Sequence, residues 1–160
     1  MTRVLLVTGS RSLATHPGAE AWARGLIREA LDGVGLLIVG DAPGPDAWAW
    51  DAAATDRWRY WTRRDHAGSI EARYDDGELR AWWTWATKNT HPLARNAAMV
   101  SDAVGLRDDG ATVTALALLD GTKRNAPDRR ATRGTEHTAG LAERAGIEVT
   151  RRTWPETEGR

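Results

Sequence analysis

The fold of this chain is restricted most strongly by short apolar runs that end at glycine-containing segments. Three glycine segments stand out: TGSR (residues 8–11), GDAPGPD (residues 40–46) and RGTEHT (residues 133–138). The first two follow directly on apolar runs at residues 4–7 and 36–39. Glycine lets backbone N–H groups approach a ligand, and a helix that begins after such a loop directs partial positive charge toward it. The pattern predicts one shared anion-binding edge at the carboxyl ends of parallel strands.

Length and composition limit the class of protein. A chain of 160 residues can form one domain with its own core, which we expect over residues 1–154, followed by a disordered tail at 155–160. Twenty-two basic residues balance 22 acidic ones, which argues against a protein whose main task is to bind DNA through a positively charged surface. Cysteine is absent, which excludes disulfides and thiolate zinc sites. No apolar stretch is long enough to span a membrane, so we expect a cytoplasmic protein.

Apolar runs alternate along the chain with segments of helical periodicity. Strands are expected at residues 4–7, 36–39, 59–63, 113–119 and 147–151. Helices are expected at residues 19–31, 46–55, 92–103 and 133–145. This alternation predicts an α/β fold, a Rossmann-like three-layer α/β/α arrangement with a parallel sheet of about five strands in the order 3-2-1-4-5. Residues 59–63 are expected at the edge of that sheet.

The middle of the chain differs from this pattern. SIEARY and ELRAWW flank Asp75, Asp76 and Gly77, a composition typical of a hairpin turn, so we expect an inserted β-hairpin near residues 69–83. The chain has nine tryptophans and no phenylalanine, and seven of the nine lie between Trp48 and Trp85. Because such large side chains usually fill a core or a subunit interface, we expect this cluster to form a homodimer contact, with at most one ring stacking on a base.

Four segments carry a family resemblance. VLLVTGSR, LLIVGDAPGPDAWA, PLARNAAMV and TRGTEHTAGLAERAGIEV resemble, in order and spacing, the YspA-like branch of the SLOG superfamily. The resemblance covers most of the chain apart from the hairpin region and the tail, and it implies a Rossmann-like domain that binds a nucleotide or a nucleotide-derived small molecule. More distant members are the LOG-type phosphoribohydrolases, the DprA DNA-processing proteins and the molybdenum-cofactor carriers.

Three functions are therefore open. A sensing, sequestering or carrying module would hold its ligand intact, whereas a LOG-like N-glycosidase or phosphoribohydrolase would split base from ribose phosphate. A DprA-like protein would bind single-stranded DNA, which the balanced charge disfavours.

The first two loops supply most of the expected ligand contacts. The first offers Thr8, Gly9, Ser10 and Arg11, and the second offers Gly40, Asp41, Gly44 and Asp46. The guanidinium of Arg11 can bind two phosphate or ribose oxygens at once. Compared with the family's typical GGARGAD, Asp41 replaces a glycine and Pro43 replaces the arginine, so a carboxylate there would need a cation or a ribose hydroxyl as its partner. Asp46 can contact the ligand or act as the N-cap of the next helix, and we favour the cap.

The third segment places Arg95 and Asn96 just inside the helix that follows Pro92, where the family has an RN pair. In LOG-type hydrolases an arginine near this point takes part in catalysis, so the resemblance makes Arg95 a candidate catalytic residue. A surface salt bridge is the alternative.

The fourth segment places Arg133, Gly134 and Thr135 at the start of the last helix, where they resemble the family's phosphate-binding GT. LOG-type hydrolases carry a glutamate three residues beyond that threonine, and this chain has Thr138 there. The neighbouring His137 could act as an acid or base near neutral pH, although a simple polar contact is the alternative.

Metal and cofactor sites are not indicated. The four histidines lie at spacings that match no metal site, so we expect no structural metal. No cofactor is required, and Mg²⁺ is expected only as the companion of a phosphorylated ligand.

Overall fold

The computed structural model describes residues 3–40, 42–53, 58–64, 67–73, 79–85, 92–123 and 130–156. The expected hairpin turn at Asp75–Gly77 and residues 157–160 of the expected disordered tail lie outside this part of the chain. Pro155 and Glu156 are described, and Glu156 forms an ion pair with Arg152.

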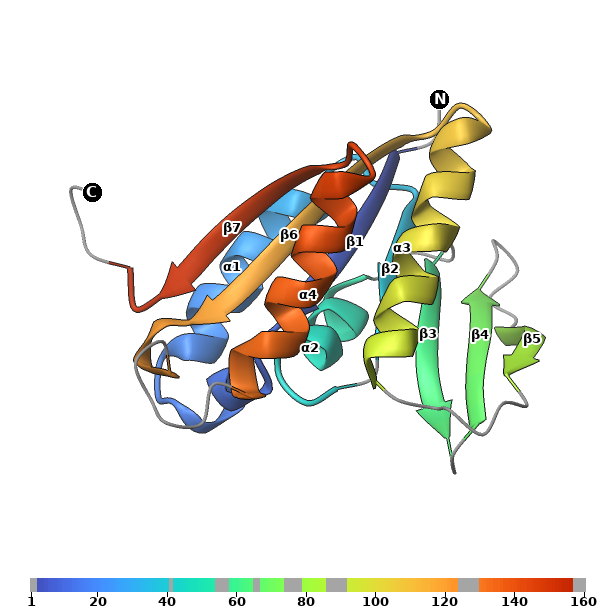
Figure 1. The fold of residues 1–160 in the computed structure, drawn as a ribbon. Helices are drawn as coiled ribbons and strands as arrows, with labels where there is room; N and C mark the ends of the chain where they lie inside the picture. The colour runs from blue at the N-terminus through green and yellow to red at the C-terminus, as the bar shows by residue number, and fades with distance from the viewer. Residues whose placement is uncertain are drawn as a thin grey trace.

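Four neighbouring parallel strands form the centre of the sheet. They are β1 (Arg3–Gly9), β2 (Leu36–Val39), β6 (Thr112–Asp120) and β7 (Glu148–Trp154), in the order β2-β1-β6-β7. In this register Val4 pairs with Leu36 on one side and with Val113 on the other. The α/β class and the parallel sheet are thus confirmed (Figure 1).

Three further strands continue the sheet beyond β2. They are β3 (Trp58–Arg64), β4 (Ala67–Arg73) and β5 (Leu79–Trp85). β3 runs parallel to β2, with Ile38 paired to Arg59, while the β3–β4 and β4–β5 pairs are antiparallel. Because β4 pairs with the far side of β3, the strand that contains Arg59 does not form the sheet edge.

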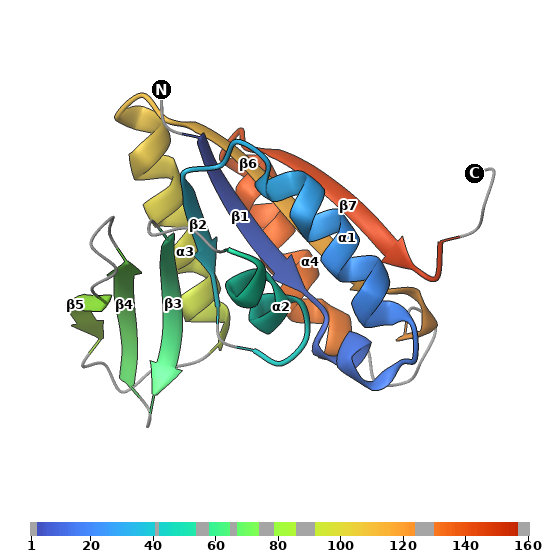
Figure 2. The same ribbon diagram turned by 180° about the vertical axis from the view of Figure 1, so that it is seen from behind.

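Helices cover both faces of the parallel strands. α1 (Ala19–Leu31) and α2 (Pro45–Ala52) lie on one face, and α3 (Pro92–Asp108) and α4 (Arg130–Arg144) lie on the other (Figures 1 and 2). Two short 3-10 helices, η1 (Arg11–Thr15) and η2 (Gly121–Lys123), follow β1 and β6. In the part of the chain that the structure describes, no helix combines the length and apolar character needed to cross a membrane.

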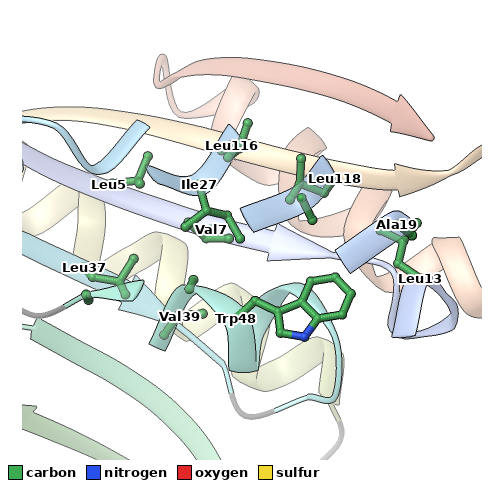
Figure 3. Packing of buried hydrophobic residues seen from close by; sticks show 13 residues of the cluster. Leu5, Val7, Leu13, Ala19, Ile27, Leu37, Val39, Trp48, Leu116 and Leu118 are labelled. Carbon is green, nitrogen blue, oxygen red and sulfur yellow. The ribbon is translucent and has the colours of Figure 1, made fainter. Parts of the chain in front are cut away.

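Two apolar clusters hold these layers together. Along β1, Leu5 and Val7 pack toward α1 and α2, whereas Val4 and Leu6 pack toward α3 and α4. All four are at most 2% exposed, so β1 is buried on both faces and is apolar without alternation. Figure 3 shows the first cluster, whose fully buried members are Leu5, Val7, Leu13, Ala19, Ala23, Ile27, Leu37, Val39, Ala49 and Leu118.

The four tryptophans whose side chains the structure describes belong to this first cluster or pack against it. Trp48 is 6% exposed and lies between α2 and the sheet (Figure 3), so its ring is part of the core and does not contribute to a dimer surface. Trp22, Trp50 and Trp154 pack against the same cluster and are partly buried. The structure does not describe the side chains of the other five tryptophans expected at a homodimer contact, and the dimer remains a prediction.

The C-terminal ends of α2 and α3 differ from the expected ones, whereas the bounds of α1 do not. α1 has the expected bounds, and Gly33 with φ +73° follows it in the left-handed conformation that glycine favours. α3 continues past Ala103 to Asp108, because Val104 and Leu106 still pack against the second apolar cluster. α2 ends at Ala52, three residues before the expected end, and the next residue, Ala53, is buried.

Candidate functional site at the carboxyl edge of the sheet

The predicted loops meet where three neighbouring strands end. β1, β2 and β6 are parallel, so their last residues, Gly9, Val39 and Asp120, lie at one side of the sheet, which we call the carboxyl edge. η1, α2 and η2 begin at this edge, and α4 contacts both η1 and β1 from the other face (Figures 1 and 2). The first two predicted loops are therefore neighbours in space, and the helix that carries the fourth segment contacts the same part of the sheet.

The first two glycine loops pack directly against each other. A Cβ on Gly9 would overlap the ring of Pro45 and lie 3.3 Å from the carbonyl oxygen of Leu118. Gly44 has φ +90°, and a Cβ there would lie 3.4 Å from the carbonyl oxygen of Ser10. Glycine is thus required at Gly9 for close packing and at Gly44 for the backbone conformation.

Within the first loop, only one side chain is free to reach outward. Ser10 is fully buried; its N–H donates to the carbonyl of Leu118 (2.9 Å), and its hydroxyl accepts from the N–H of Asp120 (3.2 Å). Thr8 is also buried, whereas Arg11 is exposed. Ser10 therefore joins β1 to β6, and Arg11 is the residue of this loop that can contact a ligand.

Asp46 does not cap the helix. α2 begins at Pro45, a residue well suited to the first helical position, and Gly44 is the N-cap residue, with no side-chain cap. Asp46 is the second helical residue, 6% exposed, and its Oδ2 accepts from the N–H of Ala42 at 3.2 Å. The expectation of an N-cap is therefore wrong, and this contact of the carboxylate holds the second loop in place.

The side chains of three other predicted contact residues are not among those that the structure describes. Gly40 is buried directly after β2. Asp41 lies outside the described residues, and so do the side chains of Arg95 and Arg133. The predicted catalytic role of Arg95 and the predicted ligand contacts of all three therefore stay predictions.

Two side chains donate hydrogen bonds to the carbonyl oxygen of Gly134, and one of these bonds joins the third segment to the fourth. The side-chain amide of Asn96, on α3, donates to the carbonyl oxygen of Gly134, on α4, at a long 3.5 Å. The hydroxyl of Thr138 donates to the same oxygen at 3.0 Å and is fully buried. Thr135 is 3% exposed, and His137 is partly exposed. The position that carries glutamate in the hydrolases thus holds a hydroxyl that is bound within its own helix.

The last helix begins earlier than expected. α4 starts at Arg130, so Gly134 and Thr135 are its fifth and sixth residues and do not begin it. At that depth in an α-helix the N–H groups take part in the helix's own hydrogen bonds. The expectation that Gly134 and Thr135 offer free N–H groups at a helix start is therefore wrong.

A polar cluster at the carboxyl edge was not predicted from the sequence. Asp120, the last residue of β6, is 1% exposed, and its carboxylate accepts four hydrogen bonds. Oδ2 accepts from the hydroxyl of Ser12 (2.5 Å) and from Nε2 of His16 (2.8 Å). Oδ1 accepts from the N–H (2.9 Å) and the hydroxyl (2.6 Å) of Thr122. We call these four residues the Asp120 network.

The network keeps Asp120 ionised. Burial by itself raises the pKa of a carboxyl group, but hydrogen bonds from Ser12, Thr122 and His16 favour the charged form and hold the pKa of Asp120 below its ordinary value. A carboxylate offers about four lone-pair positions, and all are used, so Asp120 has no capacity left to bind a ligand itself. It links η1 to η2 instead.

One signal in the sequence could have identified Asp120 itself, although not its partners. Asp120 directly follows the apolar run at residues 113–119, and polar residues at the ends of parallel strands are placed to act at the carboxyl edge. Its partners Ser12 and His16 lie 108 and 104 positions away, so no local pattern connects them. Among the described residues there is no group of three or more histidine, aspartate or glutamate side chains that could hold a metal ion.

No protein-family model matches this chain, and no curated protein matches it. The resemblance to the SLOG superfamily therefore stays a prediction, and the geometry of the carboxyl edge is the basis for inferring a function.

Proposed function

We propose that this protein binds a nucleotide or a nucleotide-derived small molecule at the carboxyl edge and holds it intact, as a sensing, sequestering or carrying module. In this proposal, β4 and β5 are the hairpin inserted into the five-stranded sheet of a YspA-like domain. The proposal rests on one main observation, the direct packing of the two glycine loops after β1 and β2.

The close packing at Gly9 and Gly44 supports a ligand-binding role for the backbone. Gly9 lies against the ring of Pro45, and Gly44 lies against the main chain of Ser10 and Arg11, so the two loops come together at the ends of adjacent parallel strands. Such positions in open α/β sheets are where ligands bind. The exposed Arg11 directly beside these loops supplies the positive charge that a phosphate requires.

Two observations favour binding over hydrolysis or DNA binding. The hydroxyl of Thr138 is buried and bound to the carbonyl of Gly134, so it cannot replace the glutamate of the LOG-type hydrolases as an acid or base. The balanced charge of the chain suits a small anion better than a long polyanion.

Thermal-shift titration with AMP, cyclic AMP, ADP-ribose and NAD tests the proposal. At least one of the four should raise the melting temperature, and chromatography should recover it unchanged. Arg11→Ala should weaken that binding by about tenfold or more, since a charge-assisted hydrogen bond contributes roughly 1.5–3 kcal/mol. Arg28→Ala, which removes the same charge from an exposed position on α1, is the matched control and should leave the affinity unchanged.

The other functions have their own readouts. Recovery of free base and ribose phosphate would identify the protein as a hydrolase. A gel shift with single-stranded DNA at low salt, in the absence of any nucleotide binding, would identify it as a DNA-binding protein. Either result would contradict the proposal.

A further inference from the structure

The Asp120 network determines which nitrogen of His16 carries the proton. Nε2 of His16 lies 2.8 Å from Oδ2 of Asp120 and 3.2 Å from the hydroxyl oxygen of Thr122. An ionised carboxylate can only accept hydrogen bonds, so Nε2 must donate. The hydroxyl hydrogen of Thr122 is directed at Oδ1 of Asp120, 2.6 Å away, so its oxygen also presents a lone pair to the imidazole. Both partners therefore require hydrogen on Nε2.

The neutral imidazole of His16 consequently presents a lone pair at Nδ1. Its ring is fixed by the hydrogen bond to Asp120 and by stacking on Trp154, with ring centroids 5.0 Å apart and planes 18° apart. The side chain is 23% exposed. Within the described part of the chain, no residue forms a hydrogen bond with Nδ1. A hydrogen-bond acceptor of fixed direction is thus held, on a side chain that is partly exposed, where β1, β6 and β7 end.

We propose that His16 is a ligand-contacting residue whose Nδ1 accepts a hydrogen bond from a hydroxyl or N–H group of the nucleoside part of the ligand, and that Asp120 is the residue that positions it. This proposal rests on the proposed function. Phosphate oxygens carry few protons at neutral pH, so they are poor partners for a nitrogen lone pair. His16 therefore recognises the sugar or the base, whereas the loop that carries Arg11 binds the phosphate.

The proton position can be measured without a ligand. Long-range ¹H–¹⁵N NMR spectra at pH 8 should give His16 the Nε2–H form in the wild type. In Asp120→Asn the side-chain NH₂ can donate to Nε2, which moves the ring hydrogen to Nδ1, as in catalytic triads whose aspartate is replaced by asparagine. An Nδ1–H form in the wild type would overturn the proposal, and an unchanged Nε2–H form in Asp120→Asn would overturn the positioning role of Asp120.

A matched substitution tests the ligand contact. In His16→Gln the amide NH₂ can replace the Nε2–H donor to Asp120, while the acceptor at Nδ1 is lost. Calorimetry with the tightest-binding of AMP, cyclic AMP, ADP-ribose and NAD should give a dissociation constant about three- to tenfold higher, the effect of one neutral hydrogen bond. Ile27→Val, a small change in the core of α1, controls for lost stability and should leave the affinity unchanged.

Two analogues locate the donor on the ligand. One lacks the free ribose hydroxyls and the other carries purine in place of adenine. The difference in affinity between the wild type and His16→Gln should disappear with one of these analogues. A difference in affinity that persists with both analogues would contradict the proposal. Equal affinity of His16→Gln and the wild type would contradict this proposal alone. If the wild type binds none of the four nucleotides, the proposed function fails together with it.

Discussion

At the scale of single residues, the carboxyl edge depends on a few side chains whose hydrogen-bonding capacity is filled. Asp120 accepts four hydrogen bonds, and Ser10 joins β1 to β6 through both its N–H and its hydroxyl. Such residues define the shape of the edge but cannot bind a ligand. Arg11 and His16 remain partly or fully exposed beside them. A specific binding site requires a preorganised scaffold and a small number of side chains that can still contact the ligand.

Removal of the Asp120 carboxylate should destabilise the folded protein. Asp120→Ala leaves the donors of Ser12, His16 and Thr122 without their buried acceptor, so the free energy of unfolding should fall by about 2–4 kcal/mol. Urea denaturation followed by circular dichroism measures this change. Asp109→Ala, at an exposed position after α3, is the control and should shift the free energy by less than about 0.5 kcal/mol. Equal effects of the two substitutions would show that the network adds no stability.

The same glycine-to-alanine change should have opposite signs at two positions. Gly9→Ala places a Cβ into the ring of Pro45 and should destabilise the protein by about 1–3 kcal/mol. Gly25→Ala adds a methyl group in the middle of α1, where no atom beyond the adjacent helix backbone lies within 4 Å, and should stabilise the protein by about 0.5–1 kcal/mol. Melting temperatures compare the two variants. A stabilised Gly9→Ala would contradict the close packing of the first two loops.

At the scale of elements, local pattern predicts the centre of an element better than its ends. The helix at residues 19–31 and the strand at 36–39 were predicted with the observed bounds, because apolar spacing and flanking glycines agree there. The ends of α2, α3 and α4 depend on packing and on neighbouring loops, which the sequence alone does not reveal. For the site, the meeting of the first two loops was predictable from parallel strands. The Asp120 network was not, since Ser12 is 108 residues from its partner.

The start of α4 can be tested by amide hydrogen exchange. Gly134 and Thr135 lie beyond the first turn of α4, so their amides should exchange more slowly than those of Ala131 and Thr132, whose N–H groups lie in the first turn. NMR-detected exchange gives the four rates in one experiment. Equally fast exchange at all four positions would restore the expectation that the helix begins at Gly134.

At the scale of the whole molecule, the carboxyl edge is continuous with the core. Trp154 packs against the first apolar cluster and also stacks on His16, which in turn binds Asp120. Leu13 of η1 is fully buried in the same cluster (Figure 3). The loops that carry the proposed ligand contacts are therefore fixed by the packing of the fold. We expect global stability and the geometry of the edge to respond together when the charge of Asp120 changes.

The dependence of global stability on pH should reveal this link. Because folding lowers the pKa of Asp120, the unfolded chain takes up its proton at a higher pH than the folded chain, near the ordinary value of about 3.9. The stabilisation is therefore complete above about pH 5 and is lost as the pH falls through the pKa of the folded state. Asp120→Asn cannot titrate at this position.

The difference in unfolding free energy between the wild type and Asp120→Asn should then narrow as the pH falls from 5 to below about 4. Glu143 and Glu156 also have lowered pKa values through hydrogen bonds with Arg151 and Arg152, but both proteins carry these pairs, so their effects cancel in the difference. Urea denaturation at each pH measures the two free energies. A difference that is the same at pH 3 and pH 7 would mean that the charge of Asp120 does not contribute to folding.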